Sequence, residues 1–140
     1  MPDFDAKEFL SLCEELYTGD SDFPLSLRRT IAGRGYYAIY LSLRQRITAT
    51  CGDCFGASGK HTSLYRACNR STTAELPIVG AALVKLYVMR IRADYKWAEA
   101  DNITNFEAED VIDTATEIFP TIAALTPQHL LELHGLVRFI

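Results

Sequence analysis

The stretch "LRRTIAGRGYYAIYLSLRQRI", residues 27–47, decides the fold of this chain. Its apolar side chains return every three to four positions, which is the period of an α-helix and differs from the alternation of a β-strand. One stripe comprises Tyr36, Tyr40, Leu43 and Ile47, and its neighbour comprises Leu27, Ile31, Arg34, Ala38 and Leu41. The sequence therefore predicts a long helix from Leu25 to Ile47.

Two glycines in the middle of this helix indicate close helix packing. Gly33 and Gly35 each cost about 1 kcal/mol of helix stability relative to alanine, and small residues at such positions let another helix approach. Arg34 lies between them on an apolar stripe, so its guanidinium must pair with a carboxylate, stack on a tyrosine or face a polar cleft. Asp94, near the end of a later helix, is the expected partner. The sequence thus predicts an Arg34–Asp94 ion pair between two antiparallel helices.

The rest of the chain also has helical periodicity. Further helices are predicted over Phe4–Tyr17, Leu64–Cys68, Leu76–Tyr95, Thr104–Leu125 and from Pro127 onward. Pro120 is expected to bend or end the helix that contains it. The fold class is therefore all-α, an up-down helical bundle of five to six helices over residues 1–125. Residues 126–140 are expected to form an additional C-terminal helix that packs on the bundle or at an interface.

Composition bounds the class of protein. The chain has 140 residues, 49% of them hydrophobic and 23% charged, which suits one globular domain with a real core. No apolar run approaches the roughly 18 residues that a membrane span needs, and the acidic start "MPDFDAKEF" differs from a secretory signal. We therefore expect a cytoplasmic protein with no membrane partner and with reduced thiols.

Charge is distributed unevenly along the chain. The net charge is −4, but residues 25–96 hold nine arginines and three lysines against three acidic residues. Residues 1–24 and 97–140 are both strongly acidic. A basic middle between acidic ends suggests an anionic partner for the centre. Neutralisation of the basic helices by the acidic ones is the alternative interpretation.

Thiols and histidines offer a possible metal site. A CxxC pair, one imidazole and a third thiol could complete a tetrahedral zinc shell, formed by Cys51, Cys54, His61 and Cys68. The gaps to His61 and Cys68 match no compact zinc finger, and Cys68 on a predicted helix would pack as a small hydrophobe. No metal or cofactor is therefore expected, and these four residues remain the alternative site. His129 and His134 are expected to be packing or interface residues.

Two runs of the sequence resemble the two halves of the HEPN domain pattern. The first run is carried by Arg34, Tyr36, Tyr37, Ala38 and Tyr40, and the second by Leu86, Arg90, Ala93, Asp94 and Tyr95. The resemblance covers roughly residues 5–122. The helix after Thr126 looks like an addition to the pattern. The resemblance implies a compact helical bundle, usually a dimer, of the kind found in toxin–antitoxin, phage-defence and RNA-processing systems.

Many domains of that family are metal-independent ribonucleases, in which an arginine is followed four to six residues later by a histidine. Arg90 occupies a place like that arginine, but Tyr95 stands where the histidine would be. A phenol with a pKa of about 10 is mostly protonated at pH 7 and is a poor base. Arginines, in contrast, hold phosphate through paired N–H donors. The sequence therefore favours binding over cleavage.

The expected site follows from these two runs. Phosphate or RNA would be bound by Arg34, Arg90, Arg92 and Lys96, with Tyr36 and Tyr37 available for stacking on bases. Arg90 and Tyr95 are the candidates for catalysis if the protein cleaves RNA. Asp94 is expected to neutralise Arg34. The opposing interpretation closes all these charges into internal salt bridges.

The expected function is that of a HEPN-like protein in a prokaryotic toxin–antitoxin or phage-defence module. It would act as a homodimer and bind RNA or nucleotide phosphate without the standard ribonuclease chemistry. One alternative is a non-catalytic interaction domain that binds a partner, such as a cognate antitoxin, through its apolar end "HLLELHGLVRFI". A second alternative is a metal-independent endoribonuclease with atypical residues.

Overall fold

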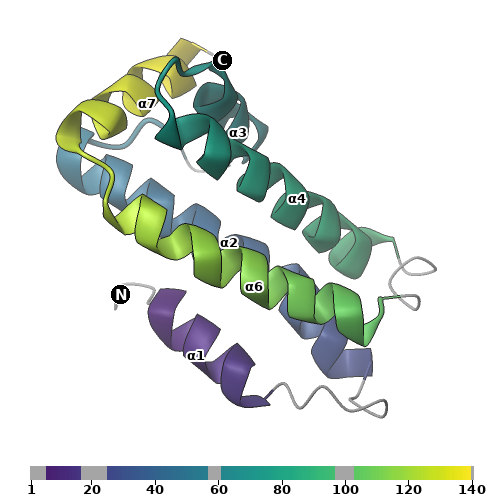
Figure 1. Cartoon of the computed structure of the whole chain (residues 1–140). Helices are drawn as coiled ribbons and strands as arrows, with labels where there is room; N and C mark the ends of the chain where they lie inside the picture. The colour runs from purple at the N-terminus through teal and green to yellow at the C-terminus, as the bar shows by residue number, and fades with distance from the viewer. Residues whose placement is uncertain (1–5, 17–24, 57–60, 97–102, 140) are drawn as a thin grey trace.

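Six helices make up the described part of the chain, which comprises residues 6–16, 25–56, 61–96 and 103–139 of a computed structural model. They are α1 (Ala6–Leu16), α2 (Leu25–Cys51), α3 (His61–Arg70), α4 (Glu75–Tyr95), α6 (Asn105–Ala123) and α7 (Pro127–Phe139) (Figure 1). Within those residues there is no strand. The prediction of an all-α bundle is therefore confirmed.

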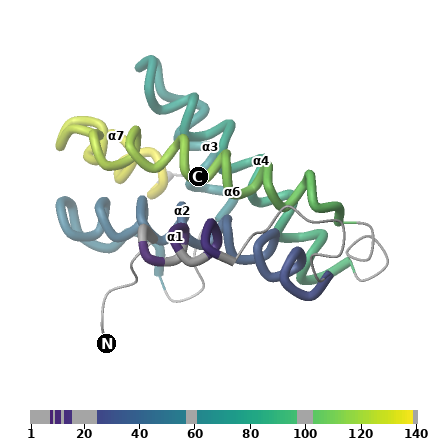
Figure 2. Tube along the Cα trace, turned by 60° about the horizontal axis from the view of Figure 1, so that its bottom comes forward, coloured from purple at the N-terminus to yellow at the C-terminus, as the bar shows by residue number. Residues whose placement is uncertain are grey.

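The longest helix, α2, is the one around which the others pack. It contacts α4, α6, α7 and α1, whereas α3 packs on α4 and α7. The chain direction reverses from α2 to α4 and again from α4 to α6, so these three helices run side by side up and down (Figures 1 and 2). The end of α4 consequently lies beside the first half of α2.

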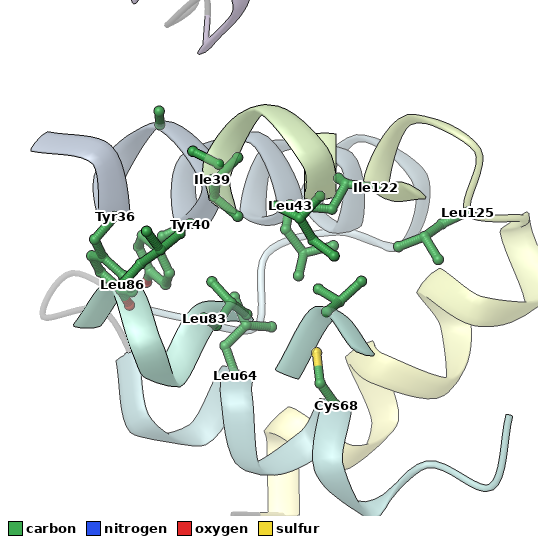
Figure 3. Packing of buried hydrophobic residues seen from close by; sticks show 14 of the residues in the cluster. Tyr36, Ile39, Tyr40, Leu43, Leu64, Cys68, Leu83, Leu86, Ile122 and Leu125 are labelled. Atoms are coloured by element: carbon green, nitrogen blue, oxygen red, sulfur yellow. The ribbon is translucent and has the colours of Figure 1, made fainter. Parts of the chain in front are cut away.

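The core is built on the apolar stripe of α2. Its four members Tyr36, Tyr40, Leu43 and Ile47 are at most 1% exposed. Figure 3 shows Tyr36 and Tyr40 directed toward Leu86 of α4, and Leu43 close to Ile122 of α6. Because α2 contacts several helices at once, its buried residues occur on more than one face of the helix.

Gly33 and Gly35 are the points at which other helices come closest to α2. A Cβ atom on Gly35 would collide with Cγ1 of Val111 in α6, and one on Gly33 would lie 2.6 Å from Oδ1 of Asp94 in α4. The prediction of close helix approach at these two positions is confirmed. Each glycine is required for the room it leaves, since its own backbone is helical.

Several helix boundaries differ from the predictions. The helix α2 continues past Ile47 to Cys51, and α3 spans ten residues from His61 to Arg70. Pro120 does not end α6, which continues to Ala123 although the proline cannot donate a backbone hydrogen bond. The guanidinium of Arg46 in α2 donates to the carbonyl oxygens of Ile122 and, at 3.0 Å, Leu125, so it satisfies the end of α6. Phe4, Tyr17 and Ile140 lie outside the described residues.

The last helix belongs to the same core as the rest of the bundle. Leu130, Leu133 and Val137 of α7 are at most 1% exposed and pack in one cluster with the side chains of α2 and α3. Thr126 and His129 cap the start of α7 with two reciprocal hydrogen bonds. The backbone amide of Thr126 donates to Nδ1 of His129, and the backbone amide of His129 donates to the hydroxyl oxygen of Thr126. None of the described helices is both long enough and apolar enough to cross a membrane.

We predict that Gly35→Ala destabilises the protein by about 1–3 kcal/mol relative to Gly135→Ala. Both substitutions gain the same helix propensity, about 1 kcal/mol. Only Gly35 has a neighbour in the way, whereas a Cβ on Gly135 meets no atom within 4 Å. The difference in unfolding free energy between the two variants, measured with urea, therefore isolates the overpacking against Val111. Equal free energies in both variants would contradict the close approach.

Candidate functional site

Arg90 of α4 is a buried cation surrounded by tyrosines. It is 8% exposed, and its Nη2 donates to the hydroxyl oxygens of Tyr37 and, at 2.9 Å, Tyr95. Its guanidinium carbon lies 5.0 Å from the ring centroids of both Tyr37 and Tyr95, and 6.0 Å from that of Tyr87. The negative faces of aromatic rings attract a guanidinium, so these contacts stabilise a charge that is largely withdrawn from water.

Asp94 is the carboxylate that compensates Arg90. Its Oδ2 lies 3.5 Å from Nε of Arg90, one turn earlier on the same helix. This pair is electrostatic only, because Nε of Arg90 makes no aligned hydrogen bond in the part of the chain that the structure describes. The predicted pairing of Asp94 with Arg34 is replaced by this pair. The carboxylate of Asp94 lies against Gly33 of α2. At that place its ion-pair partner is Arg90 of its own helix.

Arg34 turns outward, away from the stripe on which it was placed. It is exposed, and its guanidinium carbon lies 5.8 Å from the ring centroid of Tyr37. Arg34 and Asp94 nevertheless line one hollow of about 250 Å³, together with Ser26, Arg29, Thr30, Gly33 and Ala93. Positions 34 and 94 thus meet at the same end of the α2–α4 pair, as expected, but on either side of this hollow.

Arg92 has a structural role, in contrast to Arg90. It forms a bidentate ion pair with Glu107 of α6, in which Nη1 donates to Oε2 and Nη2 donates to Oε1 at 3.4 Å. Glu107 also completes a capping box with Thr104 at the start of α6. The hydrogen bond from Arg92 is the main reason that the pKa of Glu107 lies below its usual range. Arg92 therefore joins α4 to α6, and Lys96 is exposed just beyond the end of α4.

His61, the first residue of α3, is brought into the same cluster. Its Nδ1 lies 2.9 Å from the hydroxyl oxygen of Tyr36, and its ring lies 4.4 Å from the ring of Tyr40. Tyr36 is stacked on Tyr40 at 5.5 Å and is only 1% exposed. Tyr36 is therefore an internal ring, and of the two expected stacking residues only Tyr37 is partly exposed.

The surroundings of His61 keep its imidazole neutral. Burial lowers the pKa of His61, and the positive charges of Arg90 and Arg44 lower it further. Burial likewise raises the pKa of the Tyr36 hydroxyl far above its usual value, so that hydroxyl keeps its proton. A buried hydroxyl proton needs an acceptor, and Nδ1 of His61 is the acceptor within reach. The second proton of the pair then lies on Nε2 of His61, which is a donor.

Sequence reasoning missed His61 as a member of this cluster. It precedes Arg90 by 29 positions and belongs to another helix, so no spacing rule connects the two residues. The only signal was the prediction that the helices containing residues 34–40 and 86–95 meet. A third helix would then have to cover the place where they meet. Placing α3 over Tyr36 required the packing of α3 on α4.

The four residues of the alternative zinc site are not brought together. The thiol of Cys68 is buried in the core, where burial raises its pKa to about 12, and His61 is bound to Tyr36. Cys51 and Cys54 are partly exposed at the end of α2. Among the described residues, no three histidine, cysteine or acidic side chains are grouped so that they could hold a metal ion.

In comparisons with known proteins, no family model matches the chain, and no curated protein or solved structure matches it significantly. The geometry of the site is therefore the basis for any statement about function.

We predict that Glu107→Gln lowers the unfolding free energy by about 0.5–1 kcal/mol at pH 7. Glutamine still accepts the capping hydrogen bond, so the change isolates the charge pairing with Arg92. Because the pKa of Glu107 is lowered by folding, its contribution is present above its unfolded pKa and is lost as the pH falls through the folded pKa. The unfolding free energies of the two proteins, measured with urea, should therefore converge as the pH falls below the folded pKa of Glu107. A constant difference at all pH values would contradict the pair.

Proposed function

We propose that this chain is a HEPN-like protein of a prokaryotic toxin–antitoxin or phage-defence module that binds the phosphates of RNA or a nucleotide. The observation that carries the proposal is the pair of guanidiniums around Tyr37. Arg34 lies 5.8 Å and Arg90 5.0 Å from this one ring, and they come from α2 and α4 respectively. These are the two helices that contain the HEPN-like runs.

The exposed guanidinium of Arg34 supports an anionic ligand. It lines the hollow together with Arg29 and with Asp94, whose carboxylate is already paired with Arg90. The side chain of Ser26 adds a hydroxyl group at the edge of the hollow, whereas the Thr30 hydroxyl already donates to the carbonyl oxygen of Ser26 at 2.8 Å. A phosphate group prefers planar N–H donors accompanied by hydroxyl donors, and this set provides both.

Aromatic rings beside the arginines favour a ligand that carries bases. Tyr95 is 61% exposed and Tyr37 is partly exposed, so both rings have faces that a base could contact. Each ring is fixed by a hydrogen bond from Arg90 to its hydroxyl group. Stacking on rings that are already ordered loses little conformational entropy and is tolerant of sequence. Single-stranded RNA is therefore the ligand that best fits the surface.

Binding is better supported than cleavage. The Tyr36 hydroxyl donates to Nδ1 of His61, so the neutral imidazole offers a proton at Nε2 and has no free lone pair for use as a base. Tyr95 uses its hydroxyl oxygen to accept from Arg90. His61 is thus arranged as a hydrogen-bond donor and Tyr95 as a fixed partner of Arg90, so neither is arranged as a base.

A metal-independent endoribonuclease is the second candidate, and the presence of an imidazole beside Arg90 favours it. If the Tyr36–His61 hydrogen bond reversed, Nε2 of His61 could take the proton of a ribose 2′-OH while Arg90 stabilises the phosphate. Incubation of the protein with labelled single-stranded RNA and a chelator tests this. Cleavage that survives the chelator and is lost in both His61→Asn and Arg90→Ala would establish the nuclease.

A protein-interaction domain is less well supported. The apolar stripe of α7 faces the bundle, so binding a partner through it would require α7 to leave the core. Among the described side chains of α7, Leu131 is the one large apolar residue that is exposed, at 63%. A homodimer and a partner protein such as an antitoxin remain part of the proposal.

We predict that Arg34→Gln weakens binding of a short single-stranded RNA by about three- to tenfold at 0.1 M salt and reduces the salt slope by about 0.7. Arg34 is exposed and lies outside the core, so the variant should fold normally. Arg70→Gln is the matched control, because it removes the same charge from an exposed residue at the end of α3, near the start of α4. Fluorescence anisotropy provides the measurement. Equal losses in both variants would show that only net charge matters and would contradict the site.

A further inference from the structure

We propose that anion binding beside Arg90 is coupled to uptake of one proton by His61, which makes His61 a ligand-sensing residue of the site. This inference rests on the proposed function, since it names how that phosphate site responds to pH. It requires that His61 and Arg90 lie in one electrostatic environment and that His61 has a donor left for the ligand. Both conditions follow from contacts of the described residues.

The imidazole and the guanidinium share two rings. The ring of His61 lies 6.1 Å from Tyr37 and 6.2 Å from Tyr87, and the guanidinium carbon of Arg90 lies 5.0 Å and 6.0 Å from the same two rings. Tyr37 and Tyr87 therefore lie next to both groups. Because the charge of Arg90 acts on the imidazole, an anion bound at Arg90 would act on it over a similar range.

Among the described residues, the charged groups that act on His61 are positive. From α2 it meets the hydroxyl-bearing rings of Tyr36, Tyr37 and Tyr40 and the charge of Arg44, and from α4 it meets Tyr87 and Arg90. The helix α7 also packs on α3, and its Glu132 acts on Cys68 instead. Asp94, the carboxylate paired with Arg90, is not among the groups of the described segments that shift the pKa of His61, so a bound anion would add a negative charge that acts on the imidazole.

Arg44 cannot easily move away to relieve this repulsion. Its Nη2 donates to the carbonyl oxygen of Gly56 at 3.1 Å, and its guanidinium carbon lies 4.9 Å from the ring of Phe55. Arg90 is likewise fixed by its two tyrosine hydroxyls. The ligand-free site therefore holds a neutral imidazole between two fixed cations.

Binding of an anion reverses this balance. The anion offsets the charge of Arg90 and accepts a hydrogen bond from Nε2 of His61, and both effects favour the imidazolium. The added proton comes from solvent and forms an N–H bond at Nδ1, so Tyr36 changes from donor to acceptor in their hydrogen bond. The buried hydroxyl proton of Tyr36 then loses Nδ1 as its acceptor, and the attraction between the anion and the imidazolium has to offset this cost. Tyr36 is the group that switches, which gives it a positioning role.

The sign of the pH effect follows from linkage. The pKa of His61 is below its usual value in the free protein, and the bound anion raises it. Affinity is therefore low and constant above the bound-state pKa, increases as the pH falls through that value, and becomes constant again below the free-state pKa. With one proton involved, the increase is limited to tenfold per pH unit.

The test uses sulfate and a short single-stranded RNA without terminal phosphates, because neither probe changes its own charge between pH 5.5 and 8. Calorimetry in two buffers with different ionisation heats gives the number of protons taken up. The ring carbon resonance of His61 in NMR gives its pKa with and without saturating sulfate. We expect uptake of up to one proton near pH 6.5, a higher pKa in the bound protein, and roughly tenfold tighter binding at pH 5.5 than at pH 7.5.

The matched variants are His61→Asn and His134→Asn. The first should abolish proton uptake and flatten the pH profile, whereas the second changes a histidine of α7 that is not part of the cluster and should leave both unchanged. The NMR measurement on the unmodified protein needs neither variant, so the test remains decisive if His61→Asn misfolds.

Three results are distinguishable. Binding that depends on Arg34 but takes up no proton, or leaves the pKa of His61 unchanged, overturns this inference and leaves the proposed function standing. Absence of saturable binding of either probe overturns both. Proton uptake that persists in His61→Asn and vanishes in His134→Asn assigns the effect to another histidine and also overturns the inference.

Discussion

Two glycines on α2 let side chains from α4 and α6 reach the backbone of that helix, and the rest of the structure depends on this contact. Val111 occupies the space over Gly35, and the carboxylate of Asp94 occupies the space over Gly33. A side chain at Gly35 would collide with Val111 in the packed interior, which has few voids to absorb it, and one at Gly33 would displace the carboxylate of Asp94. The contact fixes which end of α4 lies beside the first half of α2, and so it determines which residues can form a site.

The buried charge of Arg90 is the main electrostatic consequence of this arrangement. A guanidinium removed from water must be stabilised by partners, and Arg90 has one ion-paired carboxylate and three aromatic rings. Arg92, two residues later, points to another side of α4 and is matched by Glu107 of α6. Two arginines of one short motif thus have different roles, because successive residues on a helix face different neighbours. Burial lowers the pKa of His61 on α3, and the positive charges of Arg90 and Arg44 lower it further.

Much of the fold could be predicted from periodicity. The stripe of Tyr36, Tyr40, Leu43 and Ile47 is buried as expected, and the helix predicted over Leu76–Tyr95 begins one residue earlier and ends at the same residue. The site was predicted less well. Arg34 was placed on an apolar stripe and paired with Asp94, yet it lies at the exposed edge of α2. Tyr36 was expected to stack on a ligand, yet it binds His61 inside the core.

By itself the sequence determined the helices, the face of α2 that is buried and the two positions where helices approach closely. These properties depend on backbone hydrogen bonds and on apolar side chains three and four residues apart, which are local in the chain. Only the tertiary structure decided which charge pairs with which, and that His61 joins Arg90 across a separation of 29 positions. Long polar side chains can reach several partners, and their choice depends on which helices meet and how much water remains between them. That choice is set by packing between distant segments, and no local spacing records it.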